Sequence, residues 1–238
     1  MKELEDSPHF PKWLRNFQTE FIGFVVVRLN IYTDFIKYLN SLQLPPRPMI
    51  DLCSGSGDIA IHIFKKNKEF NQLILSDKFP NIKSFKNDAI SYLAKSADVL
   101  EMEIQSNNYY TMFNAFHHFA DEEKQKIVQK ILDSGSRSFI VEILEPKIIY
   151  FLKVLFITTI GNLIFTPFIR PFSLKRIFFT YFIPLNIITI TYDGIISVIK
   201  SSTVKRYRKI FEGFGDSIKI FNLENNFSSI VVIEIQPK

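Results

Sequence analysis

The chain has 238 residues, 47% of them hydrophobic, one cysteine and a formal net charge of +5. This hydrophobic fraction excludes a disordered chain, and the length suits one α/β domain with an appendage. A single cysteine excludes an internal disulfide, and the charged N-terminus carries no apolar signal segment, so we expect a cytoplasmic protein. The small positive charge mildly favours an anionic partner without identifying one.

The first part of the chain predicts helices followed by a sheet. Apolar residues recur at helical spacing over 17–42, and the prolines at 44–48 end that pattern, which predicts an N-terminal helical cap over 1–47. Short apolar runs then alternate with helical segments, as in a parallel sheet with crossovers. We expect strands at 49–53, 72–77, 97–100, 109–116 and 138–144, and helices at 59–66, 79–93 and 121–135.

The last part of the chain changes character. A helix at 203–215 is followed by two apolar runs, 217–223 and 228–235, which the polar turn "ENN" joins. This arrangement predicts an antiparallel hairpin at the edge of the sheet.

Residues 146–202 form an insertion of different composition. Two uncharged stretches, 154–169 and 177–192, flank basic residues, and prolines interrupt both. Each stretch is shorter than the roughly 20 residues that usually cross a bilayer. We expect peripheral membrane contact through 148–192, at the inner face of the cytoplasmic membrane, with an internal lid as the alternative and a spanning hairpin as the least favoured reading.

The stretch "DLCSGSGD" at 51–58 suits a tight turn between a buried strand and a helix. Gly55 and Gly57 would let a ligand approach the backbone, and Asp77, 20 residues after Gly57, could accept the hydroxyls of a ribose. The nicotinamide dinucleotides and S-adenosylmethionine both contain that ribose, so this pair leaves both ligands open. Asp51 favours the cationic sulfonium of S-adenosylmethionine, because a carboxylate would repel a pyrophosphate.

With "LILSD" at 73–77 and "MFNAFHHF" at 112–119, this turn resembles the class I S-adenosylmethionine-dependent methyltransferases. A closer resemblance is to a bacterial subgroup with an apolar insertion. The class implies an α/β, Rossmann-like, seven-stranded and mostly parallel sheet with an antiparallel C-terminal strand. Its core would be 48–145 and 203–238, with 146–202 inserted. The cofactor site implied comprises Asp51, Cys53, Ser54, Gly55, Ser56, Gly57, Asp77, Lys78, Asp98, Val99, Asn114 and Ala115.

Within that site the resemblance gives particular roles. Asp77 would hold the ribose, the turn at 53–57 the methionine portion, and Asp98 the adenine.

Three residues are candidates for catalysis: His117, His118 and Asp193. The two histidines follow a strand, and on an extended segment they would point in opposite directions, so at most one would face the acceptor. Asp193 precedes a glycine and would form a turn or, alternatively, act as a base. Glu142 lies in an apolar run and needs a partner if it is buried. Because no cysteine or histidine shows ligand spacing, we expect no metal site.

These features predict an S-adenosylmethionine-dependent methyltransferase. It would transfer a methyl group to oxygen, nitrogen or carbon of a hydrophobic small-molecule or lipid-like acceptor, mainly by positioning. The N-terminal helix and the insertion would form the acceptor chamber. The alternatives are an NAD-dependent oxidoreductase and a non-catalytic, membrane-associated protein that binds S-adenosylmethionine. The basic run at 205–209 lacks interleaved aromatic residues, so we expect no nucleic-acid partner.

Overall fold

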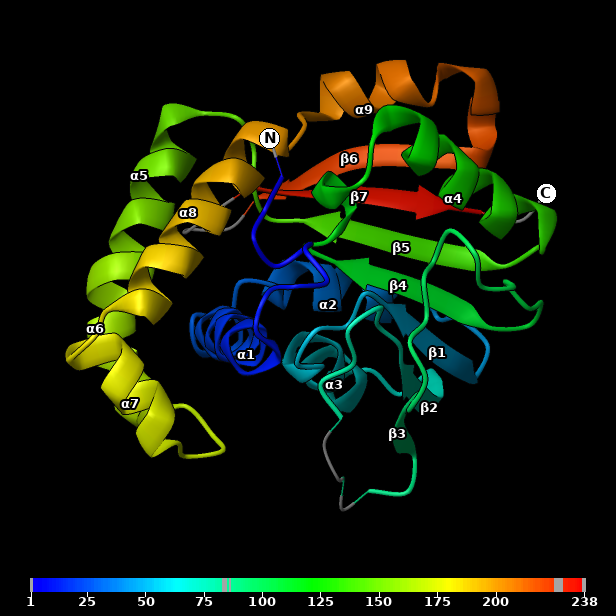
Figure 1. Cartoon of the computed structure of the whole chain (residues 1–238). Helices are drawn as coiled ribbons and strands as arrows, with labels where there is room; N and C mark the ends of the chain where they lie inside the picture. Colours follow the sequence, from blue (N-terminus) through cyan, green and yellow to red (C-terminus); the bar gives the residue numbers. More distant parts are fainter. Residues whose placement is uncertain (1, 83–84, 86, 225–228, 237–238) are drawn as a thin grey trace.

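A seven-stranded sheet in the order β3-β2-β1-β4-β5-β7-β6 forms the centre of the computed structural model, which describes residues 2–82, 85, 87–224 and 229–236 (Figure 1). Strands β1 to β5 are parallel, and β7 is antiparallel to both of its neighbours. This confirms the predicted sheet and the antiparallel pairing of the two C-terminal strands; residues 225–226 of the predicted turn lie outside the described residues. The strands are β1 (Arg47–Leu52), β2 (Phe70–Leu75), β3 (Ile90–Tyr92), β4 (Tyr109–Phe113), β5 (Arg137–Glu142), β6 (Ile218–Glu224) and β7 (Ser229–Ile235).

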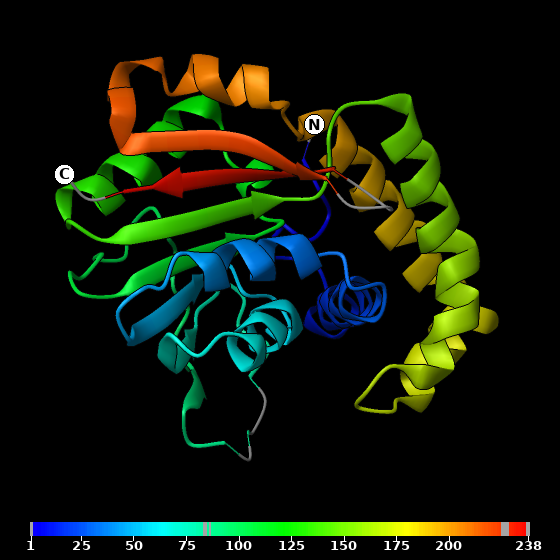
Figure 2. The same cartoon turned by 180° about the vertical axis from the view of Figure 1, so that it is seen from behind.

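Helices cover both faces of the sheet (Figures 1 and 2). Helices α2 and α3 pack on one face, where Phe35 of α2 meets Phe113 and Phe139 of the strands edge to face. Helices α4 and α9 pack on the other face. The α-helices are α1 (Lys12–Arg28), α2 (Thr33–Ser41), α3 (Asp58–Lys66), α4 (Asp121–Asp133), α5 (Ile148–Phe156), α6 (Asn162–Phe165), α7 (Leu174–Tyr181), α8 (Leu185–Lys200) and α9 (Val204–Ile210).

Four shorter helical segments complete the described structure. Phe116–His118, Thr166–Phe168 and Glu212–Ser217 are 3-10 helices, and Ile157–Gly161 is a π-helix between α5 and α6. The π-helix makes α5 and α6 nearly continuous, so the insertion begins with one long helical stretch.

Several sequence-based predictions of local structure are wrong. The described residues of 79–93 form no helix, and β3 lies there instead, because pairing with the edge of β2 outweighs the local helical pattern. No strand forms at 97–100, where the Asp98 carboxylate accepts a hydrogen bond from the Leu100 N–H and stabilises a turn. The helical region at 17–42 divides into α1 and α2 around Asn30, whose φ is +52°.

The turn after β1 depends on the absence of a side chain at Gly57. Gly57 has φ +77°, and a Cβ there would lie 2.5 Å from Leu75 Cδ1 of β2. We expect Gly57→Ala to lower the free energy of unfolding by about 2–4 kcal/mol, because strain in the left-handed region adds to overpacking. Urea unfolding would measure this loss. Gly213→Ala is the control, since its Cβ would meet nothing within 4 Å; equal losses in both variants would contradict the prediction.

The insertion is a group of helices beside the carboxyl ends of the strands, from α5 to α8 (Figures 1 and 2). Phe21 and Val25 of α1 form a small apolar cluster with Ile169 and Ile190 of the insertion. At Gly194 a Cβ would lie 2.7 Å from Val154 Cγ1, so this glycine allows α8 to approach α5 closely. The insertion therefore packs mainly on α1 and on itself.

Candidate functional site

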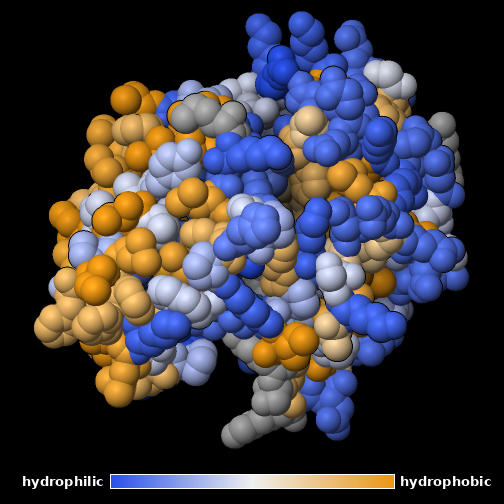
Figure 3. Space-filling model, in the orientation of Figure 1, coloured by the Kyte–Doolittle hydropathy of each residue, from blue (hydrophilic) through white to orange (hydrophobic). Residues whose placement is uncertain are grey.

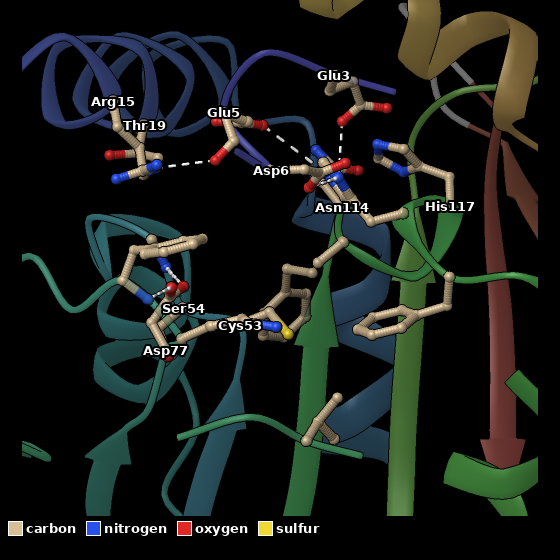
Figure 4. Close-up of a pocket in the computed structure, with 18 of the residues that line it drawn as sticks. Glu3, Glu5, Asp6, Arg15, Thr19, Cys53, Ser54, Asp77, Asn114 and His117 are labelled. Atoms are coloured by element: carbon tan, nitrogen blue, oxygen red, sulfur yellow. Dashed lines mark hydrogen bonds and ion pairs between the residues drawn. The ribbon is translucent and has the colours of Figure 1, made fainter. Parts of the chain in front are cut away.

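A pocket of about 900 Å³ lies at the carboxyl ends of the central parallel strands (Figure 4). Its other wall is formed by residues 2–8 and the first half of α1, which cross above the strand ends. In open α/β sheets this is the crevice where ligands bind. Ten of the residues implied for the cofactor line it: Cys53, Ser54, Gly55, Ser56, Asp77, Lys78, Asp98, Val99, Asn114 and Ala115. Asp51 and Gly57 are outside that lining.

The glycine turn is held in shape from two sides. The Asp77 carboxylate accepts hydrogen bonds from the Gly55 N–H at 2.8 Å and the Phe79 N–H at 2.7 Å. From α1, the Thr19 carbonyl accepts a hydrogen bond from the Ser56 hydroxyl at 3.1 Å. Cys53 and Gly55 both have positive φ, which directs the backbone around the pocket. The turn is therefore preformed by contacts with β2 and α1.

The pocket rim beyond β2 carries a pair of opposite charges. Lys78 Nζ lies 2.7 Å from Asp98 Oδ2, and both side chains line the pocket. Behind this loop, Lys130 of α4 donates to the carbonyls of Val99, Leu100 and Met102 at 3.1, 3.2 and 2.5 Å. The loop at 98–102, which is expected to contact the adenine, does not form a strand, but these hydrogen bonds hold it in place.

Asp51 is buried beneath the turn, with 2% of its surface exposed. Its Oδ1 accepts a hydrogen bond from the Thr111 hydroxyl at 2.7 Å. Burial raises the pKa of Asp51 to about 7, although the Thr111 and Ser54 hydrogen bonds partly oppose the shift. Asp51 is not among the residues that line the pocket, so its attraction for a bound sulfonium would act across the residues of the turn.

This raised pKa predicts a change in stability with pH. Folded Asp51 holds its proton up to about pH 7, whereas an unfolded aspartate loses it near pH 4, so this residue makes stability fall as the pH rises through that window. We expect Asp51→Asn to be more stable than the wild type at pH 8 by on the order of 2 to 4 kcal/mol, with little difference at pH 4. Urea unfolding at both pH values measures this, and a pH-independent difference would contradict it.

The two histidines lie side by side. They belong to the 3-10 helix Phe116–His118, and their ring centroids are 4.5 Å apart. The expectation that they point in opposite directions is therefore wrong, because alternation requires an extended backbone. Both line the pocket.

Glu142 of β5 orients His117. His117 is 3% exposed, and its Nδ1 lies 2.6 Å from Glu142 Oε2. The other oxygen of Glu142 accepts a hydrogen bond from the Phe116 N–H at 2.7 Å, so this buried carboxylate has the partner that the sequence demanded. In the neutral tautomer whose Nδ1 donates to Glu142, Nε2 carries no proton and can act as an acceptor or ligand.

Carboxylates of the N-terminal segment surround His118. Its Nδ1 lies 2.7 Å from Glu3 Oε2 and 2.9 Å from Asp6 Oδ1, and its Nε2 lies 3.8 Å from Glu5 Oε1. Burial alone would lower the pKa of His118, but its hydrogen bonds to Asp6 and Glu3 raise that pKa well above its usual value. Lys200 adds a positive charge 3.2 Å from Glu3 Oε1.

Asp193 does not reach the pocket. It lies inside α8 and not in a turn. The glycine that follows it does not mark a turn, because it serves the close packing of α8 on α5. Its carboxylate accepts hydrogen bonds from the Leu4 N–H at 2.6 Å and the Glu5 N–H at 3.3 Å. Asp193 therefore fastens the N-terminal segment across the site.

The sequence reasoning missed the residues of this N-terminal segment. Glu3, Glu5, Asp6 and, on α1, Arg15 line the pocket, and Figure 4 shows them opposite the turn and the strand ends. The acidic run at 3–6 was the signal available, but no spacing links it to residues 114 positions later. The insertion was expected to form part of the chamber. Of residues 146–202, all within the described structure, Lys200 alone lines the pocket.

The sheet order and the pocket at the strand ends define a class I, Rossmann-like methyltransferase fold. Magnesium protoporphyrin IX methyltransferase from Synechocystis PCC 6803, solved with bound SAH, shares this fold at a TM-score of 0.50 and 13% identity, over 90% of this chain and 84% of its own. Human N-acetylserotonin methyltransferase in complex with SAM is 13% identical over 81% of this chain, with a TM-score of 0.48. The chain spans about half of that second protein, 48% of its length. No curated protein sequence matches the chain.

The sequence profile of the ubiE/COQ5 methyltransferase family matches residues 26–164, more than half of the chain. The chain belongs to this family of methyltransferases. The Synechocystis enzyme was solved with SAH, the demethylated form of S-adenosylmethionine. The pocket of the chain fits that cofactor. The cavity is within the size range of small-molecule sites, the turn offers backbone in a close-approach conformation, and Asp77 places a carboxylate beside it. The closer bacterial subgroup and the domain boundaries stay predictions.

Proposed function

We propose that the enzyme methylates a hydroxyl group of an amphipathic, lipid-like small molecule. The observation that carries this proposal is the continuity of one pocket from the glycine turn to the cluster of histidines and carboxylates. A hydroxyl acceptor must lose a proton as it gains a methyl group, and this cluster supplies groups that receive protons. A neutral hydroxyl is a weak nucleophile until it loses that proton, whereas an amine or an activated carbon attacks first and loses its proton afterwards, so these bases favour oxygen.

In this proposal the cofactor supplies an electrophilic methyl group, and the residues of the chain hold the cofactor and the acceptor in the orientation that the transfer requires. Asp77 holds the ribose, the turn at 53–57 the methionine portion, and the loop at Asp98 the adenine. Asn114 keeps the end of β4 in place, since its Oδ1 accepts a hydrogen bond from the Ile143 N–H at 2.9 Å. The N-terminal segment, tied down by Asp193, closes the pocket from above and excludes water from the reacting atoms.

The insertion suggests where the apolar part of the acceptor lies. Most of its exposed side chains are apolar, with Arg170 and Lys175 as charged exceptions. Six apolar side chains are each more than half exposed: Ile148, Phe156, Phe168, Leu174, Phe182 and Ile188. Its inward side chains include a polar network, in which Asn162 Oδ1 accepts hydrogen bonds from Thr166 at 2.8 Å and from Asn186 at 3.3 Å. An apolar exterior over a hydrogen-bonded polar interior is typical of helices in contact with lipid.

We propose that this surface rests in the membrane interface at the cytoplasmic face. The stretch Ile148–Phe168 is long and apolar enough to cross a membrane, and α7 with α8 would make a second candidate bent by 77°. However, both candidates lie beside α1 and the strand ends (Figure 1). A spanning orientation would therefore carry the hydrophilic surface of the neighbouring sheet domain into the lipid. Figure 3 shows the apolar surface over the insertion, apart from the hydrophilic surface over the sheet.

Vesicles of mixed zwitterionic and anionic phospholipid test this contact. The wild type should sediment with them, and Phe168→Glu with Phe182→Glu should reduce binding about tenfold or more, because two apolar side chains lose their burial. Leu93→Glu is the matched control, an exposed leucine beside β3 and away from the insertion. A wild type that stays in the supernatant would leave the insertion as an internal lid.

Methyl transfer itself is tested with labelled S-adenosylmethionine and a fractionated lipid extract, followed by mass spectrometry. We expect one lipid-soluble component to gain a methyl group with the wild type and with His62→Ala, whereas His117→Ala should abolish transfer and retain cofactor binding. Cofactor binding with no methylated product in any fraction would favour the non-catalytic alternative. Titration that detected NAD binding without S-adenosylmethionine binding would favour the oxidoreductase.

A further inference from the structure

The end of the pocket at the N-terminal segment, called the acidic end here, holds more ionisable side chains than one proton acceptor requires. Glu3, His117 and His118 each direct one ligand atom into a common space, and these atoms all lie within 4.8 Å of one another. We propose that these three side chains bind a divalent transition-metal cation, with zinc as the reference ion. Cation binding goes beyond methyl transfer and can be measured without any acceptor, so its failure is distinct from the failure of the proposed function.

The donor set has the composition of a metal centre. Two imidazole nitrogens and one carboxylate oxygen suit zinc, iron or cobalt, and they leave coordination positions open for another ligand. A tetrahedral ion with bonds of about 2.0–2.2 Å needs ligand atoms roughly 3.3 Å apart, so small side-chain rotations would complete the site. The lining already holds all three residues at one end of the cavity.

Glu142 provides the support that a metal-bound histidine requires. It holds His117 Nδ1 at 2.6 Å, which leaves Nε2 as the nitrogen that faces the cation. A carboxylate behind a ligating imidazole fixes its orientation and increases its basicity. Glu142 is 1% exposed and is itself held by the Phe116 N–H, so this support is rigid.

The carboxylates around His118 outnumber the protons available to them. Glu3 and Asp6 both lie within 3 Å of the same nitrogen, Nδ1, which can carry only one proton. Glu3 is 2% exposed, and its described partners are both positively charged or protonated groups: His118 Nδ1 at Oε2 and Lys200 Nζ at Oε1. Lys200 Nζ lies 3.2 Å from Oε1, and a cation would take the place of the proton between Oε2 and His118 Nδ1. Binding would release the proton that His118 shares with Asp6.

This site would also have a place in the proposed reaction. An open coordination position in the pocket would face the acceptor, and a hydroxyl oxygen bound there would lose its proton more readily. The polar end of the acceptor would thus be fixed by the cation, and the methyl group would arrive from the side of the glycine turn.

Equilibrium dialysis of the full-length, untagged protein against zinc, with metal analysis, tests the proposal. Cobalt substitution adds a visible spectrum that reports nitrogen coordination. We expect one bound zinc per chain in the wild type. His118→Ala and Glu3→Gln should weaken binding at least about tenfold, and Glu142→Gln by about 10- to 100-fold. His62→Ala, a histidine on α3 away from the pocket, should bind as the wild type does.

Two outcomes would overturn the proposal. One is a wild type that binds no more zinc than His118→Ala does. The other is a cobalt spectrum unchanged in both His118→Ala and Glu3→Gln, which would place the metal elsewhere. Thermal unfolding of each variant shows whether it is folded, and Glu3→Gln keeps the test decisive if His118→Ala fails to fold.

Discussion

Replacing Arg176 by methionine is expected to lower the free energy of unfolding by about 3–5 kcal/mol. The Arg176 side chain is 1% exposed and forms an ion pair with Glu20 of α1. It also donates to the carbonyls of Ile169 and Pro171 at 3.3 and 3.2 Å, so one guanidinium joins the insertion to the N-terminal helix. Methionine fills similar space but leaves the Glu20 carboxylate buried without its charged partner. Urea unfolding followed by circular dichroism measures the loss.

A second variant separates the lost ion pair from lost packing. The double substitution Arg176→Met with Glu20→Met removes both charges, and we expect it to recover most of the stability, because an apolar pair leaves no uncompensated charge. Lys205→Met, an exposed lysine on α9, is the control for a lost positive charge and should change stability by less than about 0.5 kcal/mol. A single Arg176→Met variant that loses less than about 1 kcal/mol would contradict the account.

Asp77→Asn should weaken the binding of S-adenosylmethionine and of S-adenosylhomocysteine alike, by about 10- to 100-fold. The two compounds share the ribose that Asp77 is proposed to hold, so both should lose the same contact. In addition, an amide in place of the carboxylate sets an N–H group against the N–H of Gly55 or Phe79, both of which now donate to Asp77. Isothermal titration measures both affinities.

The control for this variant is Asp216→Asn, which removes a carboxylate from an exposed position outside the pocket. Thermal unfolding of Asp77→Asn shows whether the turn itself has collapsed. Affinities within about twofold of the wild type, in a folded variant, would remove Asp77 from the cofactor site. A loss confined to S-adenosylmethionine would instead indicate that the residue acts on the sulfonium.

Much of the fold could be predicted because its signals are local. Alternating apolar runs and helical segments placed six of the seven strands, and the glycines at 55 and 57 marked a turn whose backbone needs positive φ. The missing strand, β3, is three residues long and exists because β2 offers it an unpaired edge. A pattern read over so few residues cannot outweigh the helical spacing around it.

The side of the pocket around the glycine turn was predictable for the same reason. The turn and the three loops that follow β2, β3 and β4 are each contiguous in the sequence, and ten of the twelve predicted residues line the pocket. Asp51 is the instructive exception. The strand position was correct, but alternation along β1 directs its side chain toward Thr111 beneath the pocket surface.

The acidic end of the pocket has no local signal. Glu3 meets His118 because Asp193, in the middle of α8, binds the backbone of Leu4 and Glu5 and draws the N-terminal segment across the strand ends. Three segments far apart in the chain must fold against each other before these groups become neighbours. The local pattern of residues thus carried the class of enzyme and its cofactor, because a turn and a strand end are built from adjacent residues. The groups proposed to face the acceptor, and the cation site proposed among them, came from long-range packing, which leaves no periodicity in the sequence.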